Sequence, residues 1–474
     1  MKGSARAQGL VRAAEGHHRA GRLLQADALC REALELQPRH AHALHLLGII
    51  SLQYDDPETA SKLLRQAADI QPGMAELQAN LGYALFRLGR HEQAIAHLRA
   101  AIGLQPDHIL AHNNLGNALM QLDKGEEAIE CYRAAVASDP GHPESHFNLG
   151  LAFRDWGLMD EAAASLRTAL SLKPRFAEAH NVLGALYQET GLLEGAEASL
   201  RAALQVRPDY ADAYFNLHAV LLDSSGAQAA IPCLQRAVEL QPAEPRYRFF
   251  LGSLLDYAGD AAAARPQLEA AERGSAADRA RLDGWRYLHC ANAPLPTIVG
   301  SPIRAFRIGL EAARHDGLVL EFGVRFGVSL RQIAGLAGQE VHGFDSFEGL
   351  PEPWHHEPKG AYTTKGILPP MPSNVRLHPG WFEDSLPRFL ASHSGALRFV
   401  NVDCDLYSST RTVLQHLAPR VVSGTVMVFD EYFGYEHWRE DEFRAFDEAV
   451  QEHGWRYEYL CCSFFTKQAV VRIL

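Results

Sequence analysis

The sequence predicts two folds in succession: an all-α solenoid of helix pairs, then an α/β doubly wound (Rossmann-like) domain. Two observations carry this prediction. Small residues recur every 34 residues through the first half, and strand-like runs alternate with helix-like runs through the second half. We place the solenoid at residues 1–275, a linker at 276–302 and the α/β domain at 303–474. A length of 474 residues agrees with a multidomain chain.

The repeat is set by glycines 34 residues apart, at Gly48, Gly82, Gly116, Gly150 and Gly184. Alanines follow at fixed offsets, and a proline closes most units. Small residues let two antiparallel helices approach closely, and proline ends each pair. One pair cannot bury its apolar face alone, so neighbouring pairs stack into a solenoid. This pattern resembles the tetratricopeptide repeat, in about eight units, which implies a groove for a protein or peptide partner.

A second feature of the repeats is an asparagine two residues before the glycine position in four units, at Asn80, Asn114, Asn148 and Asn216. The site tends to face the groove, and an amide can both donate and accept hydrogen bonds to an extended backbone. This ladder resembles the groove of the O-GlcNAc transferase repeat domain. The alternative is that asparagine is simply common at this site of the repeat. Both interpretations stay open.

From about residue 303, continuous apolar strands separated by helices predict a parallel sheet covered on both faces. Ligands of such sheets bind beyond the carboxyl ends of the strands. The first strand ends at Gly323 and Gly327, whose G-x-x-x-G spacing differs from that of dinucleotide binders. The second ends at Asp345, which we expect either to accept from a ribose diol or to cap a turn.

Two later strands both end in carboxylates. "FVNVDCD" delivers Asp403 and Asp405, and "GTVMVFDEY" delivers Asp430 and Glu431. With the usual strand order, these ends lie side by side and next to the glycine loop. Up to four carboxylates in one cleft favour a hard divalent cation, Mg²⁺ or Mn²⁺. The alternative is one helix-capping aspartate with the other carboxylates solvated.

Four segments of the second half resemble the macrocin O-methyltransferase family: "LEFGVRFGVSL", "VHGFDSFEGLPEPW", "GWFEDSLP" and "VDCDLYSSTRTVLQHLAPRVVSGTVMVFDEY". The resemblance covers residues 303–474. It implies an S-adenosyl-L-methionine-dependent, Mg²⁺-requiring enzyme that methylates a hydroxyl, chiefly on sugars. The family usually has two aspartates where this chain has Asp430-Glu431.

The resemblance also implies roles for single residues. The methionine side of the cofactor would meet Glu321, Gly323, Gly327 and Ser329. The ribose would meet Asp345, the adenosine Ser346 and Phe347, and the adenine the segment from Gly380 to Phe382. The metal would be held by Asp403, Asp430 and Glu431, with Asp405 as the general base. Segment 352–375, which is rich in proline, would form a loop on the substrate side.

Composition and charge limit the possible partners and the cellular compartment of the protein. A net charge of −12 disfavours nucleic acid and anionic membranes as partners. No apolar run is long enough to span a bilayer, and the first residues lack a signal peptide's apolar core. Seven scattered cysteines favour a reducing, cytoplasmic setting. The glycine spacing disfavours a nicotinamide oxidoreductase, which leaves one other class: a repeat scaffold with an inactive methyltransferase-like domain.

Overall fold

The structure is a computed structural model that describes residues 2–291 and 294–474. The chain forms two compact units. The first runs up to Trp156 and includes Asp160–Pro174, and the second comprises Gly157–Met159 with Arg175–Leu474.

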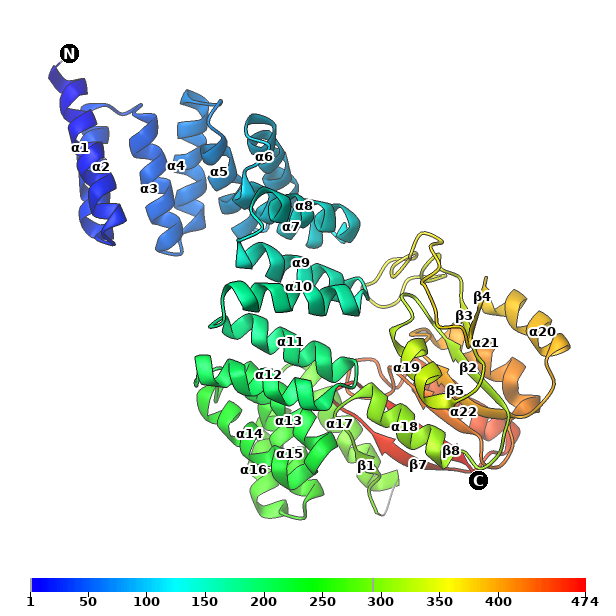
Figure 1. The fold of residues 1–474 in the computed structure, drawn as a ribbon. Coiled ribbons are helices and arrows are strands. Elements are labelled where there is room, and N and C mark those ends of the chain that lie inside the picture. Colours follow the sequence, from blue (N-terminus) through cyan, green and yellow to red (C-terminus); the bar gives the residue numbers. More distant parts are fainter. Residues whose placement is uncertain (1, 292–293) are drawn as a thin grey trace. The chain divides into compact units, whose positions relative to one another are not determined.

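The first unit consists of antiparallel helix pairs (Figure 1). Its helices are α1 (Lys2–Arg19), α2 (Leu23–Leu36), α3 (Ala41–Gln53), α4 (Pro57–Ile70), α5 (Ala75–Arg87), α6 (His91–Leu104), α7 (Ile109–Met120), α8 (Gly125–Ser138), α9 (Pro143–Asp155) and α10 (Met159–Leu172). The second unit begins with further helices of the same kind: α11 (Ala177–Glu189), α12 (Leu193–Val206), α13 (Ala211–Ser225), α14 (Ala227–Leu240), α15 (Pro245–Tyr257), α16 (Ala261–Glu272) and α17 (Ala276–Ala291).

The repeated glycines lie where the two helices of a pair touch. A Cβ atom added to Gly48 would lie 2.6 Å from Leu64 Cγ, and one added to Gly82 would lie 2.6 Å from Leu98 Cγ. Ala60 is fully buried beside the same contact. The close approach predicted from the small residues is confirmed, because a larger side chain would push the helices apart.

The second unit continues into an eight-stranded sheet of order β1-β7-β8-β6-β5-β2-β3-β4. The strands are β1 (Thr297–Ile298), β2 (Leu318–Phe322), β3 (Val341–Asp345), β4 (Val375–Pro379), β5 (Leu397–Val402), β6 (Val426–Phe429), β7 (Tyr457–Cys462) and β8 (Ala469–Ile473). The helices that alternate with them are α18 (Pro302–Ala312), α19 (Val328–Ala337), α20 (Phe382–Ser392), α21 (Tyr407–Leu417) and α22 (Glu442–His453), with a 3₁₀ turn at Ala418–Arg420.

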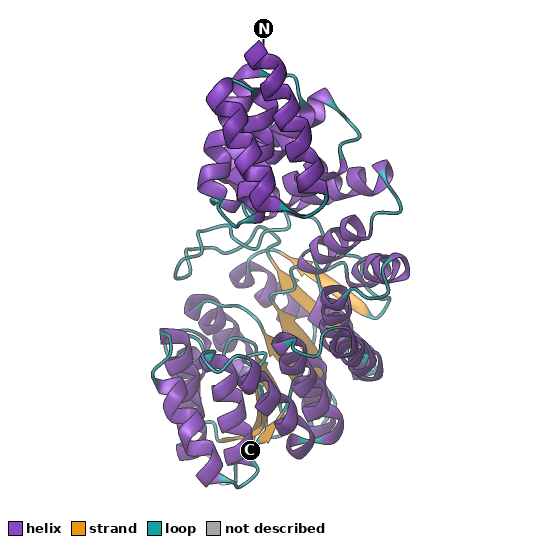
Figure 2. Ribbon diagram, turned by 90° about the vertical axis from the view of Figure 1, so that its left-hand side faces the viewer, coloured by secondary structure: helices purple, strands orange, loops and turns teal. Residues whose placement is uncertain are grey.

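Helices cover both faces of the sheet, as the continuous apolar strands predict (Figure 2). Phe306 of α18 and Ile333 of α19 belong to one core with Val319 of β2. Leu386 of α20 belongs to the other core with Phe322 of β2. The predicted doubly wound fold is confirmed, and β6, β5, β2 and β3 are consecutive neighbours, as the expected strand order requires.

One strand departs from the predicted parallel sheet. β8 pairs antiparallel with both β6 and β7. The connection between β7 and β8 is only six residues, 463–468. Such a short link cannot carry a crossover helix, so it forces the chain to return in the opposite direction.

Segment 276–302, expected to be a linker, contains regular structure. α17 fills its first half, and β1 pairs in parallel with β7. The boundary between the two compact units also falls near residue 175, not at 275. The physical reason is burial: Trp285 of α17 is 2% exposed and packs against Phe464 of the β7–β8 connection. One apolar core therefore runs from the last helix pairs into the sheet.

Polar contacts join the same parts of the second unit. Asp223, in α13, accepts hydrogen bonds from the Gly300 N–H and the Ser301 hydroxyl. Gln188, at the end of α11, donates to the Gly300 carbonyl, and Gln332 of α19 donates to the Glu189 carbonyl. The last helix pairs thus contact the start of the α/β domain and the helix that follows the glycine loop.

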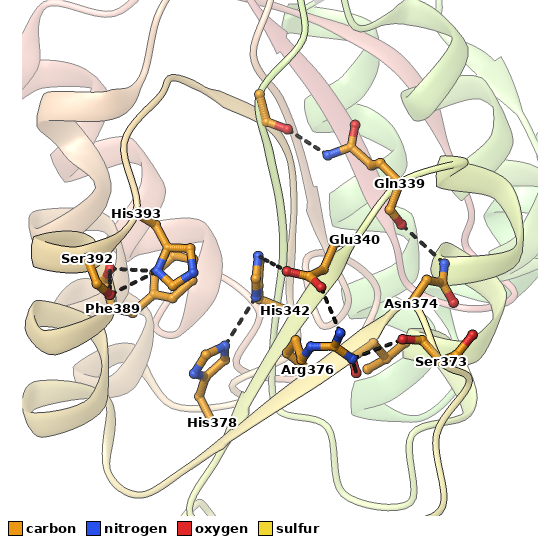
Figure 3. Close-up of polar contacts among 12 residues, drawn as sticks. Gln339, Glu340, His342, Ser373, Asn374, Arg376, His378, Phe389, Ser392 and His393 are labelled. Atoms are coloured by element: carbon orange, nitrogen blue, oxygen red, sulfur yellow. Dashed lines mark hydrogen bonds and ion pairs between the residues drawn. The ribbon is translucent and has the colours of Figure 1, made fainter.

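The outer edge of the sheet holds a group of histidines (Figure 3). His342 of β3 and His378 of β4 lie 3.2 Å apart between ring nitrogens, and His393 lies edge-on to His342. Glu340 contacts both His342 and Arg376 (Figure 3). Burial and the neighbouring His378 lower the pKa of His342 to about 4.

The described helices include none that is long and apolar enough to cross a bilayer.

Candidate active site

The glycine loop after β2 lies directly against the end of β5. Gly323 has a φ of 89°, and a Cβ atom there would lie 1.7 Å from the Asp403 carbonyl oxygen. The Asp403 N–H donates to the Phe322 carbonyl at 2.9 Å. Gly327 has a φ of 70° and caps the N-terminus of α19. Glycine is needed at position 323 because the ends of β2 and β5 approach too closely for a side chain.

Glu321 and Ser329 lie at the base of this loop. Fully buried Glu321 accepts hydrogen bonds from the Ser329 hydroxyl and from the Asn401 side-chain amide. Burial raises the pKa of the Glu321 carboxyl to about 8. Glu321 Oε2 and Asn401 Oδ1 have no hydrogen-bond partner within the described part of the chain. Buried polar atoms of this kind are normally paired, so this corner can take one further hydrogen-bonding partner.

Asp345 links two loops at the end of β3. Its Oδ2 accepts from the Arg325 N–H at 2.7 Å, and its Oδ1 accepts from the Phe347 N–H at 2.6 Å. The second of these bonds is the turn cap that was one of the two expectations for this residue. Each oxygen retains a second lone pair for a ligand.

The four acids at the ends of β5 and β6 come together, as the strand order predicts. Burial raises the pKa of Asp405 to about 7, and the nearby Glu431 and Asp430 add to the shift. Burial followed by the charges of Asp430 and Asp405 raises the pKa of Asp403. Asp403 directly follows β5, and Asp405, two residues later, has a φ of 59°, so the chain turns between the two aspartates. The raised pKa values of both aspartates have the same two causes, burial and neighbouring carboxylates of like charge.

Sequence reasoning missed Glu442, the first residue of α22, which belongs to this cluster. Its carboxylate accepts from the Cys404 N–H at 3.0 Å and from the Glu431 N–H at 3.2 Å. It thereby ties together the loops that carry the two acid pairs. Asp441, one residue earlier, accepts from Trp354, His355 and Tyr435. These contacts hold the loop after β3 against α22, and no local sequence motif marks either acid.

Lys467 and Gln468 were also missed. The Lys467 ammonium lies 2.9 Å from both carboxylate oxygens of Glu431, and the Gln468 amide donates to Asp430 Oδ1 at 2.5 Å. The signal that identifies them is the antiparallel pairing of β8 with β6. Residues just before β8 then lie opposite residues just after β6.

A cavity of about 1000 Å³ opens beyond the carboxyl ends of β2, β3, β5 and β6. The predicted site residues that line it are Gly323, Asp345, Ser346, Phe382, Asp403, Asp405 and Glu431. The other predicted residues of the α/β domain lie outside this lining, as far as the described residues go: Glu321, Gly327, Ser329, Phe347, Gly380 and Asp430. Four aromatic side chains also line the cavity: Trp354, Tyr362, Trp381 and Tyr435. This volume suits a nucleoside-sized ligand with room for an acceptor.

The predicted metal ligands are not arranged as a metal site. Among residues 2–291 and 294–474, no group of three or more His, Cys, Asp or Glu side chains has the geometry to hold one ion. Glu431 is engaged by Lys467, and Asp430 by Gln468. Oxygen donors are the right chemistry for Mg²⁺, but the set as placed does not fit it.

The asparagine ladder makes contacts between neighbouring repeats. Asn80 bonds to the ring of His45 at 2.9 Å, Asn148 donates to Asn113 at 3.3 Å, and Asn216 donates to Asn181 at 3.0 Å. Each partner lies 35 residues earlier in the chain. The half-buried amides therefore join repeats, and their role toward a partner stays a prediction together with that of Asn114.

Known families match two parts of the chain, the repeats and the α/β domain. Residues 320–432 match a family described as a methyltransferase domain. Tetratricopeptide repeat families match residues 82–123, 113–175, 177–210 and 220–280.

Two curated proteins match parts of the chain. One is 8-demethyl-8-(2,3-dimethoxy-alpha-L-rhamnosyl)-tetracenomycin-C 4'-O-methyltransferase of Streptomyces olivaceus, 33% identical over 110 residues, which is 19% of this chain and 40% of that protein. The other is demethyldecarbamoylnovobiocin O-methyltransferase of Streptomyces niveus, 37% identical over 77 residues, or 16% of this chain and 28% of that protein. The chain thus covers less than half of either relative.

Solved structures with similar repeats include pilF of Pseudomonas aeruginosa, at 19% identity and a TM-score of 0.40 over 45% of this chain and 97% of that one. YrrB, described as a TPR protein with an unusual peptide-binding site, matches at 21% identity and a TM-score of 0.33 over 38% of this chain and 94% of that one. These low scores leave the repeat assignment resting on the 34-residue spacing and the family matches. The chain is therefore an array of tetratricopeptide repeats followed by a methyltransferase domain.

Proposed function

We propose that the chain is an S-adenosyl-L-methionine-dependent O-methyltransferase that acts on a hydroxyl group, chiefly that of a sugar. One observation carries the proposal: Gly323, Asp345 and Asp405 line one cavity at the carboxyl ends of adjacent strands. The names of both curated relatives describe O-methyltransferases, and one of those names includes a rhamnosyl group. We assign catalysis to residues 303–474 and recruitment of a protein or peptide partner to the repeats of residues 1–275.

Residues at the strand ends would hold the cofactor. The two unpaired polar atoms at Glu321 and Asn401 are assigned to the methionine side of the cofactor, and the remaining lone pairs of Asp345 suit the ribose diol. The adenine side is assigned to Phe382 and Gly380, the adenosine to Ser346 and Phe347, and the methionine side to Ser329. When bound, the cofactor supplies an electrophilic methyl group on a sulfonium.

Asp405 is the proposed proton acceptor for the hydroxyl. A hydroxyl about as acidic as water, with a pKa near ~15.7, costs roughly 12 kcal/mol to ionise at pH 7. Asp405, which lines the cavity, lowers this cost by taking the proton as the oxygen attacks. The aromatic walls at Trp354 and Trp381 exclude water and orient the acceptor. The expected divalent cation at Asp403, Asp430 and Glu431 is not part of this proposal, because these residues as placed do not fit it within the described part of the chain.

The first test is cofactor binding by calorimetry to the full chain, with S-adenosylmethionine compared against NAD. We expect saturable binding of the first only. A chain that binds neither would favour the second class, a repeat scaffold with an inactive catalytic domain. Transfer of a labelled methyl group to a panel of glycosides, with phenols as the non-sugar comparison, then identifies the acceptor class.

A further inference from the structure

The pairing of β8 with β6 places two side chains opposite the second acid pair. Phe429 of β6 is the register partner of Ala469 of β8. The same antiparallel register, carried one and two residues beyond the end of β6 and before the start of β8, puts Asp430 opposite Gln468 and Glu431 opposite Lys467, and both pairs are in contact. The contacts are therefore a consequence of the sheet, which fixes the backbones on both sides.

Lys467 is held at its backbone as well as at its ammonium. Its carbonyl accepts from the N–H groups of Tyr432 at 3.0 Å and Phe433 at 3.3 Å, just after Glu431. Its φ is 61°, a left-handed conformation that few lysines adopt. Its ammonium is also 5.7 Å from the centre of the Tyr435 ring. The side chain is 40% exposed, but its backbone is held on both counts and its ammonium meets both Glu431 oxygens.

The length of Glu431 fits the contact. Both Glu431 oxygens reach the Lys467 ammonium, and only 18% of the Glu431 side chain is exposed. Both oxygens of the third predicted ligand are therefore already paired with a cation from this chain.

We propose that Lys467 occupies the place beside Glu431 that a divalent cation would take, so that this chain uses a side-chain ammonium as the positioning charge there. Two cations cannot share that carboxylate without strong repulsion, because they would lie within a few ångströms in a partly buried place. Lys467 is thus a positioning residue that acts through Glu431, and it excludes Mg²⁺ from the acid cluster. The inference deepens the proposed function, on which its relevance to catalysis rests.

The test is metal binding to the full chain after treatment with a chelator, followed by calorimetric titration with MgCl₂. We expect no saturable Mg²⁺ binding by the wild type and saturable binding by Lys467→Met, with an affinity at least about tenfold above the weakest that the titration detects. Lys467→Gly serves as a second variant, because glycine accepts the positive φ and protects the fold. Lys467→Arg keeps the charge and should behave like the wild type. Adding Glu431→Gln to Lys467→Met should remove the gain.

Tight Mg²⁺ binding by the wild type would overturn the proposal, because the metal would then coexist with Lys467. Equal affinities in the wild type and in both uncharged variants would overturn it as well. S-adenosylmethionine binding is measured on the same samples. A wild type that fails to bind the cofactor contradicts the proposed function, while the Mg²⁺ comparison still decides the role of Lys467.

Discussion

Asp223 Oδ1 lies 2.6 Å from the Gly300 backbone nitrogen and accepts its hydrogen bond across 77 residues of sequence. Asp223 belongs to a repeat helix, and Gly300 precedes the first helix of the α/β domain. Gly300 must be glycine, since a Cβ atom there would lie 2.1 Å from the Ala219 carbonyl oxygen. The last repeats and the α/β domain are therefore joined by a hydrogen bond from a backbone N–H to a side-chain carboxylate, and residues 175–474 belong to one compact unit.

Asp223→Ala should destabilise this unit by roughly 2–3 kcal/mol, because the Gly300 N–H and the Ser301 hydroxyl lose their buried acceptor. The measurement is the free energy of unfolding in urea, followed by tryptophan fluorescence. Asp209→Ala, an exposed aspartate in the same unit, is the control and should change stability by less than about 0.5 kcal/mol. Equal values for the two variants would contradict a structural role for this contact.

Phe464→Ala should cost roughly 3–5 kcal/mol, the usual range for a buried phenylalanine. The ring is 5% exposed and packs on Phe249, Trp285 and Phe433, which come from both sides of the junction. Phe464→Leu keeps most of the apolar volume and should cost less than half as much. Thermal unfolding of the two variants measures the difference, and a neutral Phe464→Ala would show that the junction does not support the fold.

Asp345→Ala should weaken S-adenosylmethionine binding by roughly 1.5–3 kcal/mol, the scale of a charge-assisted hydrogen bond. Calorimetric titration of the folded variant gives the value. Asp345→Asn retains an acceptor for one of the two backbone N–H groups, so it separates the loop contact from the charge. An unchanged affinity in Asp345→Ala would remove this residue from the cofactor site.

Asp405→Asn should keep cofactor binding and lose turnover by roughly 10²–10⁴-fold, since only the proton acceptor changes. Asparagine tolerates the left-handed backbone at this position, so the fold should persist. Single-turnover transfer of a labelled methyl group to the identified acceptor measures the rate. Full activity in this variant would assign the proton to another group.

Stability should fall in mild acid because of His342. Its pKa is lowered to about 4 in the folded chain, below the ~6.5 of an unfolded histidine. The folded state therefore favours the neutral ring, so this contribution is present above about pH 6.5 and lost as the pH falls toward 4.

His342→Phe removes the titrating group and keeps a ring against Phe389. Urea unfolding at neutral pH and near pH 4.5 should show a smaller loss of stability in the variant than in the wild type. Identical pH slopes in the two proteins would show that His342 does not titrate with folding.

The sequence alone determined the repeat, the doubly wound fold and the meeting of acids at strand ends, because each follows from local periodicity. A 34-residue interval specifies helix pairs, and parallel strands bring their carboxyl ends to one edge, so Asp345, Asp403 and Asp405 were expected near Gly323. Only the tertiary structure brought in Glu442, Lys467 and Asp223. These side chains reach the acid cluster or the domain junction through the start of α22, the antiparallel return of β8 and the packing of α13. Such contacts depend on long-range pairing and on the filling of one core, which no local pattern encodes.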